Sequence, residues 1–403
     1  MTYRQWSLVG AMAIYGLFGV PAPQVIGWPE IGIAAGLLAA IGPGRPLWVL
    51  TGFVLRTSTA PAYLIAGTIA FSLLLWLPLL RGLVMEWPAR AVVRDIVPLC
   101  FLFLPIFLGS RPAVLPTHLV LAWALAGVGV AFVGRWWMAN GWSFSGIGLY
   151  AYSDGRDYLL NAPAVVFAAN WLVLHAIVWI GIKSRCRWGR VMLSATGGGL
   201  CLAALAATVH RWTLVLSGLV LIGYLVFGLS GRRRTVGLAA ILTLILAGVL
   251  ILTLAPNDPL TGTVDQIIAK TRLVGFNQRM SEAAEAIGQV GRSLPSILCG
   301  DGWGALIANP AVGGWRVGYT HSFAAYVLLK GGVIGMMAML VYLLSLTPSA
   351  IAVARRTPVL ALALLPPLTD GLLMHTSFKF LCFGLLLAVI TMAGTDRSPD
   401  AQL

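Results

Sequence analysis

The sequence predicts an all-α polytopic membrane protein, and its composition and patterning carry that prediction. Of its 403 residues, 59% are hydrophobic and only 10% are charged, and the mean hydropathy is +0.89. Soluble domains carry about 25% charged residues, and a chain this apolar has too few polar atoms to cover a water-facing surface. The apolar residues also gather in long runs separated by polar or Pro/Gly clusters, which is the pattern of membrane-spanning helices.

The apolar runs predict about twelve membrane-spanning helices, since each span needs about 20 apolar residues. We interpret the first run as a span and not as a signal peptide, because no small-residue cleavage site follows it. The second and eleventh spans are short, and the stretch 47–55 is ambiguous. The predicted spans are 6–22, 29–42, 60–80, 92–109, 114–133, 158–182, 190–208, 212–229, 235–254, 321–346, 358–372 and 373–393.

The positions of Lys and Arg predict the orientation of these spans. Basic residues cluster in three loops of the same parity, 183–190, 232–234 and 355–356, which the positive-inside rule places in the cytoplasm together with both termini. The charged segment 81–95 and the long stretch 255–320 then lie on the outer face. One membrane domain results, with a nine-span region (1–254), an outer loop with short amphipathic helices (255–320) and a three-span region (321–403).

Several function classes are excluded by what the sequence lacks. The net charge of +14 lies in short loops between apolar runs, so inner loops and anionic lipids explain it and no nucleic-acid partner is expected. The five cysteines have no metal-knuckle spacing. The chain has no Walker loop, no Asp-x-Asp pair and no nucleophile elbow. We therefore expect neither a metal nor a cofactor.

Three ionisable residues on the predicted outer face could carry chemistry. His321 lies where the outer loop re-enters the membrane, and imidazole is the side chain best suited to move a proton near neutral pH; the alternative is a histidine satisfied at a helix N-terminus. Arg211 lies in a tight outer turn and could simply reach lipid phosphates. Arg279 lies within the outer loop, where Glu282 could pair with it on a helix surface.

The residues around His321 resemble a known family signature. His321-Ser322 is followed after nine residues by Gly332, and then after two residues by Gly335. This spacing, His-[Asn/Ser/Gln]-x9-Gly-x-x-[Gly/Thr/Tyr], resembles the signature of the O-antigen ligase and polymerase superfamily, which comprises glycan transferases of the bacterial inner membrane. The position of the histidine after the one long outer loop is similar as well.

Two arginines are similar to arginines of the same family. Arg211 begins a span after a short outer turn, although its flanking residues differ from the usual Ser-Arg-Gly. Arg279 lies early in the outer loop, upstream of Pro295 and of a Gly-x-Gly turn at 300–302. The motifs cover roughly 191–346, and the rest of the chain resembles the family by its span count.

This resemblance implies a GT-C-like, inverting glycosyltransferase that uses no metal or cofactor. The donor would be a glycan on undecaprenyl pyrophosphate and the acceptor a glycan or the lipid A-core, at the periplasmic face of a multi-pass inner-membrane protein. Arg211 and Arg279, with Arg272 in reserve, would bind the pyrophosphate, because guanidinium groups contact phosphate oxygens bidentately. His321 would take the proton from the acceptor hydroxyl.

Other functions remain open from the sequence. The motif favours a ligase, but a polymerase of O-antigen or exopolysaccharide would use the same three residues. A lipid-glycan transporter or flippase would place ionisable groups within its spans, where this chain has mainly Asp370 and Lys379. A scaffold role would need none of these groups.

Overall fold

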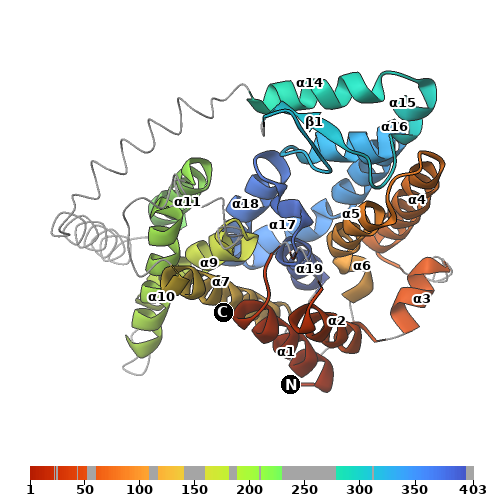
Figure 1. Cartoon of the computed structure of the whole chain (residues 1–403). Helices are drawn as coiled ribbons and strands as arrows, with labels where there is room; N and C mark the ends of the chain where they lie inside the picture. Colours follow the sequence, from red (N-terminus) through yellow and green to blue (C-terminus); the bar gives the residue numbers. More distant parts are fainter. Residues whose placement is uncertain are drawn as a thin grey trace.

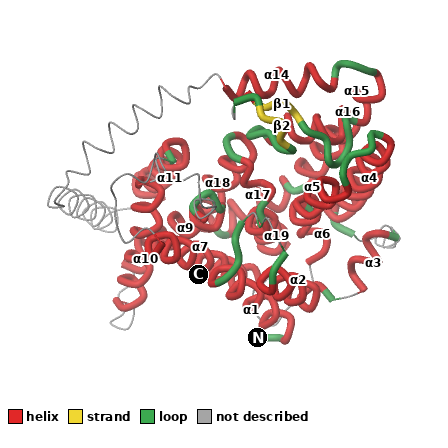
Figure 2. The backbone as a smooth tube through the Cα atoms, viewed as in Figure 1, coloured by secondary structure: helices red, strands yellow, loops and turns green. Residues whose placement is uncertain are grey.

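The computed structural model describes residues 1–21, 23, 26–42, 44–51, 60–108, 117–139, 159–180, 188–207, 210–228, 278–310 and 313–395. Within these ranges the chain is mostly helical, and one short β-hairpin lies among the helices (Figure 1 and Figure 2). The predicted all-α class is therefore confirmed in its coarse form.

The helices follow the apolar runs of the sequence. The N-terminal part contains α1 (Tyr3–Leu17), α2 (Trp28–Ile41), α3 (Gly44–Leu50), α4 (Ala62–Val84), α5 (Ala89–Leu102), α6 (Leu104–Leu108) and α7 (Thr117–Ala139). The middle contains α9 (Pro163–Ile180), α10 (Trp188–Ala207), α11 (Arg211–Gly223) and its π-helical continuation η4 (Tyr224–Gly228). The C-terminal part contains α14 (Gln278–Val290), α15 (Leu294–Cys299), β1 (Ile307–Asn309), β2 (Trp315–Val317), α16 (Phe323–Ser345), α17 (Thr347–Arg356), α18 (Pro358–Leu373), η6 (Thr376–Lys379) and α19 (Leu381–Thr395).

Six of the described helical segments are long and apolar enough to cross a membrane, or seven if the bent pair α2 and α3 counts as one span. The helices α18 and α19 are apolar but shorter, with 16 and 15 residues. The described residues therefore do not reach the predicted count of about twelve. The predicted span 235–254 lies outside the described residues.

The last predicted span, 373–393, begins later than the sequence suggested. The backbone N–H groups of Met374 and His375 both donate to the carbonyl of Asp370, which ends α18. A short 3₁₀ turn, η6, follows before α19 starts at Leu381. The boundary is displaced because this turn carries polar side chains, including Lys379.

The core of the bundle is centred on α9, whose residues from Pro163 to Ile177 are all buried. Helices α7, α10 and α18 pack against α9, and α19 packs against α5, α6, α7 and α17. Because α9 and α19 contact protein on most sides, their sequences are apolar all round instead of amphipathic.

A polar layer covers one end of the bundle. Figure 1 shows α14 lying across this end with α15 and β1 beneath it, on the side away from the N-terminus. The antiparallel strands pair Ile307 with Val317 and Asn309 with Trp315. A small apolar cluster of Ala286 and Val290 on α14, Ile307 on β1, and Ala325 and Leu329 on α16 holds this layer against the bundle. One of the short amphipathic helices expected within 255–320 is thus present as α14, and residues 255–277 lie outside the described residues.

Helix α16 is interrupted at Gly332, where φ is 61° and ψ is −160°. A side chain at this position would overlap the backbone nitrogen of Gly300 and the carbonyl oxygen of Leu298. Only glycine adopts this conformation without strain. The first glycine after His321 in the sequence pattern therefore allows the end of α15 to pack directly on the α16 backbone.

Candidate functional site

His321 and Glu282 form a hydrogen-bonded pair at the end of the bundle that α14 covers. Glu282 lies near the start of α14, and His321 directly precedes Ser322, the N-cap residue of α16. The Nδ1 atom of His321 lies 3.2 Å from Oε2 and 3.3 Å from Oε1 of Glu282, and the backbone N–H of His321 donates to Oε2 over 2.9 Å. A carboxylate accepts hydrogen bonds and does not donate them. In the neutral ring Nδ1 therefore carries the proton, and Nε2 holds the lone pair.

Glu282 is fixed from a second side. The side-chain amide of Asn309, on β1, donates a hydrogen bond to Oε1 of Glu282. Both Glu282 and Asn309 are fully buried, whereas 27% of the His321 side chain is exposed. A buried carboxylate needs hydrogen-bonding partners, and here the partners hold it against the imidazole. An accessible imidazole oriented by a fixed carboxylate is the arrangement of a general base.

Glu282 is the residue of this candidate site that was not predicted from the sequence. The sequence alternative paired it with Arg279 on an exposed helix surface, but Glu282 is buried and faces His321. The three-residue spacing suggested a local pair with Arg279, whereas the contact that Glu282 makes is with His321, far along the chain. The detectable signal was the presence of Glu282 as an acidic residue in the same loop that precedes the candidate histidine.

Arg279 lies one helical turn before Glu282, and its Nη1 contacts Sδ of Met374. Burial lowers the pKa of Arg279 below its ordinary value; the carboxylates of Asp370 and Glu282 act to raise this pKa, and the charge of Arg211 acts to lower it. These influences place Arg279 within electrostatic range of both carboxylates and of Arg211.

The three predicted site residues are linked through Glu282 and Arg279. His321 is bound to Glu282, and Arg279 lies near both Glu282 and Arg211, which begins α11. Arg272 lies outside the described residues. An imidazole with an available lone pair can accept a proton, and guanidinium groups in the same region can stabilise an anion.

A second histidine–carboxylate pair lies on the α11 and α18 side of this region. Oδ1 of Asp370 accepts hydrogen bonds from Nδ1 of His375 over 2.8 Å and from Oγ1 of Thr213 over 3.2 Å. The rings of His375 and His210 are 5.5 Å apart between centroids. The signal for this cluster was Asp370 itself, since a carboxylate in an apolar segment needs a partner.

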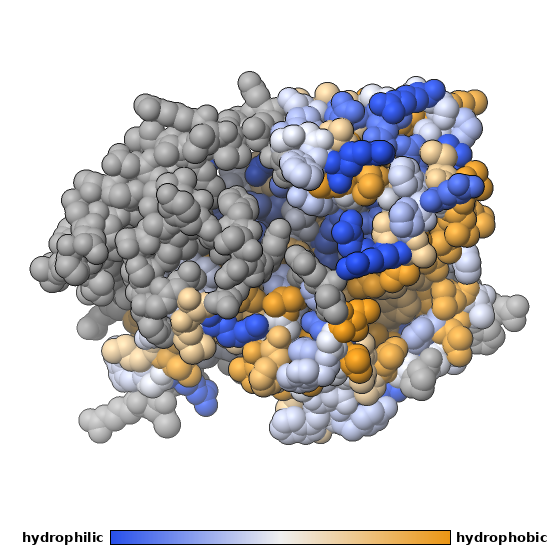
Figure 3. Space-filling view, viewed as in Figure 1, coloured by the Kyte–Doolittle hydropathy of each residue, from blue (hydrophilic) through white to orange (hydrophobic). Residues whose placement is uncertain are grey.

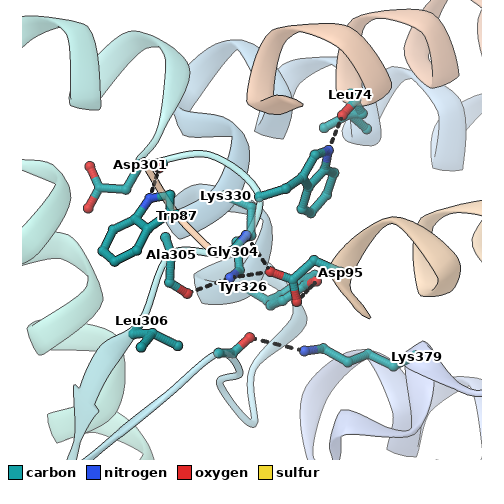
Figure 4. A network of polar contacts seen from close by, with 12 residues as sticks. Leu74, Trp87, Asp95, Asp301, Gly304, Ala305, Leu306, Tyr326, Lys330 and Lys379 are labelled. Carbon is teal, nitrogen blue, oxygen red and sulfur yellow. Dashed lines mark hydrogen bonds and ion pairs between the residues drawn. The ribbon is translucent and has the colours of Figure 1, made fainter. Parts of the chain in front are cut away.

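A buried ion pair lies where the polar layer meets the bundle (Figure 4). Nζ of Lys330 on α16 lies 2.6 Å from Oδ2 of Asp95 on α5, and the two side chains are 0% and 2% exposed. Asp95 also accepts from the backbone N–H of Gly304 over 2.9 Å, and Lys330 donates to the carbonyl of Ala305 over 2.6 Å. The pair therefore ties the loop after α15 to the helices α5 and α16.

Lys379 lies at the edge of the same network. Its Nζ donates to the carbonyl of Gly318 over 3.3 Å and lies 3.9 Å from the centroid of the Tyr326 ring. Figure 4 shows Lys379 approaching the loop from the helices on the opposite side to Asp301. Lys379, treated in the sequence as a charge within a span, instead belongs to the η6 turn and contacts the segment between β2 and His321.

Among the described residues, no group of three or more His, Cys, Asp or Glu side chains is arranged to hold a metal ion. No protein-family model matches this chain, and no curated protein is significantly similar to it in sequence. The chemistry of the site must therefore be argued from its own geometry.

Proposed function

We propose that this protein is a bacterial glycosyltransferase of the O-antigen ligase and polymerase type, with a GT-C-like membrane fold. It would move a glycan from undecaprenyl pyrophosphate to a hydroxyl of an acceptor glycan or of the lipid A-core. The contact between His321 and Glu282 carries this proposal. It holds the ring proton on Nδ1 and leaves the lone pair on Nε2 of a partly exposed imidazole, which can accept the proton of an acceptor hydroxyl.

The proposed reaction divides the work between His321 and the two arginines. His321 takes the proton of the acceptor hydroxyl as that oxygen attacks the anomeric carbon. The bond between this carbon and the pyrophosphate breaks with its electron pair on the leaving oxygen, and attack from the opposite face inverts the configuration. Arg211 and Arg279 stabilise the departing charge, since guanidinium groups remain protonated and bind phosphate oxygens. The chemistry requires no metal, and the activated donor supplies the driving force.

A transfer assay with purified protein tests this function. The donor is a lipid-pyrophosphate glycan, and the rate is measured with and without a chelator. We expect transfer in both conditions and a near-complete loss in His321→Ala. Asn309→Ala would lose less activity because it removes only an anchor of Glu282. Unchanged transfer by His321→Ala would refute the assignment.

The polymerase alternative is separated from the ligase by cell products. A deletion strain that lacks all chains beyond one repeat indicates a polymerase, whereas long chains retained on the carrier lipid indicate a ligase. The favoured function is the ligase, because the His-Ser-x9-Gly-x-x-Gly spacing is kept in full.

The proposed location is the inner membrane, with the α14 layer in the periplasm. In a variant lacking its five native cysteines, a membrane-impermeant maleimide should label Ala284→Cys on the exposed face of α14 in intact spheroplasts. Ala354→Cys, on α17 beside Arg355, should be labelled only after the membrane is permeabilised. The reverse result would place His321 in the cytoplasm and end the proposal.

One observation favours a function of another class. The ion pair between Asp95 and Lys330 lies fully inside the bundle, and buried ionisable pairs also occur in the proton relays of transporters. A lipid-glycan transporter would move substrate without forming a product in the transfer assay, and it would not depend on His321.

A further inference from the structure

A polar cavity lies beside the loop that follows α15. Its volume is about 340 Å³. Among the residues that line it are three arginines, one carboxylate and two hydroxyls: Arg81, Arg292, Arg316, Asp301, Ser293 and Ser296. None of the residues that hold His321 lines this cavity, so it is separate from the proposed active site.

The arginines have donors available for a ligand. Arg81, at the end of α4, is held in place because its Nε donates to the carbonyl of Gly300 over 3.3 Å and its Nη2 donates to Oγ of Ser296 over 3.2 Å. Its remaining N–H groups are not used by these contacts. In the part of the chain that the structure describes, the exposed side chains of Arg292 and Arg316 make no hydrogen bond or ion pair with the protein.

The charges of the cavity are unbalanced. Three guanidinium groups face one lining carboxylate, Asp301, whose Oδ2 already accepts from Nε2 of Gln289 over 2.8 Å. Like charges that converge repel one another unless an anion lies between them. Several guanidinium groups with nearby hydroxyls fit a phosphate, which offers oxygen acceptors in several directions.

The surroundings of the cavity indicate that this phosphate belongs to a lipid. Leu83 and Val84, next to Arg81 on α4, are 62% and 73% exposed. Leu294, on α15 beside Ser293, is 67% exposed. Figure 3 shows hydrophilic residues gathered toward the α14 end of the molecule with hydrophobic surface beside and below them. Arginines at such a boundary lie at the level of lipid head groups.

We propose that this cavity, the Arg81–Arg292–Arg316 pocket, binds the phosphate group of a lipid in the leaflet on the α14 side of the protein. Gln289 of the pocket lies two turns of α14 beyond Glu282, or about 10 Å along the helix axis. A lipid held in the pocket therefore places its head group alongside the His321 region. The binding itself needs no glycan transfer and stands independently of the proposed reaction.

Calorimetric titration of the full-length protein in neutral detergent tests this pocket. The probes are a short-chain phosphatidic acid, a diacylglycerol of the same chain length without phosphate, and inorganic phosphate. The pocket variant is Arg292→Gln/Arg316→Gln, and the matched control is Arg90→Gln/Arg355→Gln, which removes two exposed arginines elsewhere. All four positions are exposed, so both double variants should keep the thermal unfolding midpoint of the wild type.

Phosphatidic acid should bind the wild type and the control variant at least about tenfold more tightly than the pocket variant, because two charge-assisted contacts are lost. Diacylglycerol should bind all three proteins weakly. Equal binding of phosphatidic acid to the pocket variant and the wild type would overturn the site. Inorganic phosphate binding as tightly as phosphatidic acid would overturn its assignment to a lipid.

Discussion

Oε2 of Glu282 accepts hydrogen bonds from both the backbone N–H and the ring Nδ1 of His321, a residue 39 positions later in the chain. One carboxylate oxygen therefore fixes both the position of the peptide and the direction of the ring. The second oxygen is occupied by Asn309. Glu282 acts through His321 and is a positioning residue in the proposed reaction.

Glu282→Gln should lower the kcat of glycan transfer by about 10²–10⁴-fold and change the KM for the donor little. Glutamine keeps the shape of the side chain, but its amide presents a donor where the carboxylate accepts, so His321 loses its tautomer. Steady-state kinetics with the lipid-pyrophosphate donor measure this effect. Glu285→Gln, on the same helix, is the matched control and should retain the wild-type rate; a normal rate in Glu282→Gln would show that the pair is only structural.

Arg211→Lys and Arg279→Lys should each raise the KM for the donor and lower kcat, with a combined loss in kcat/KM of roughly 10–100-fold. Lysine keeps the charge but loses the planar pair of donors that contacts two phosphate oxygens. The measurement is a titration of the lipid-pyrophosphate donor at saturating acceptor. Arg90→Lys, on the exposed start of α5, should leave both constants unchanged. If neither site variant changes the KM or kcat, the arginines are not the pyrophosphate ligands.

Gly332→Ala should prevent accumulation of folded protein, whereas Gly335→Ala should be tolerated. At Gly332 the added methyl group would overlap the backbone around Gly300, and φ of 61° is unfavourable for alanine. At Gly335 the nearest atom to a methyl group is Cδ2 of Leu74, 3.1 Å away, and a leucine side chain can shift. Detergent-solubilised yield and size-exclusion profiles compare the two variants. Equal yields would mean that the close packing on Gly332 is not required.

The helices could be predicted because a helix that crosses a bilayer needs a continuous run of apolar residues, and such a run is visible in the sequence. The predicted span 60–80 corresponds to α4 and the predicted span 321–346 to α16, each displaced by a few residues. Helix ends that depend on hydrogen bonds formed in the fold could not be located in this way. The end of α18 depends on backbone N–H groups that return to Asp370, and the predicted span 373–393 ran through that turn.

The site was predictable only where a residue type was informative on its own. His321 stands out because imidazole moves protons, but its partner Glu282 is defined by a contact that exists only after α14 packs against α16. Asp95 shows the same limit. In the sequence it belongs to a charged outer segment, whereas in the fold it is buried with Lys330, 235 positions away. Pairing across such distances is a property of the packed bundle and not of a local pattern.

The ion pair between Asp95 and Lys330 makes a prediction that separates a structural role from a catalytic one. Lys330→Met should destabilise the protein by about 3–5 kcal/mol, because it leaves the Asp95 carboxylate buried without its cation. Asp95→Asn/Lys330→Met should be less destabilised than Lys330→Met, since no unpaired charge remains. Lys379→Met is the control, as its Nζ donates to a carbonyl instead of a carboxylate.

Denaturation in detergent compares the stability of these three variants with that of the wild type, and the transfer assay compares the activity of each protein per folded molecule. A structural pair predicts normal turnover by the double variant once it is folded, because neither side chain contacts His321. A double variant that folds well but has lost turnover would show that Asp95 and Lys330 take part in the reaction and do not only support the loop. A wild-type protein that moves lipid without forming a transfer product, together with a folded double variant that has lost this movement, would favour the transporter, since a proton relay needs both ionisable groups.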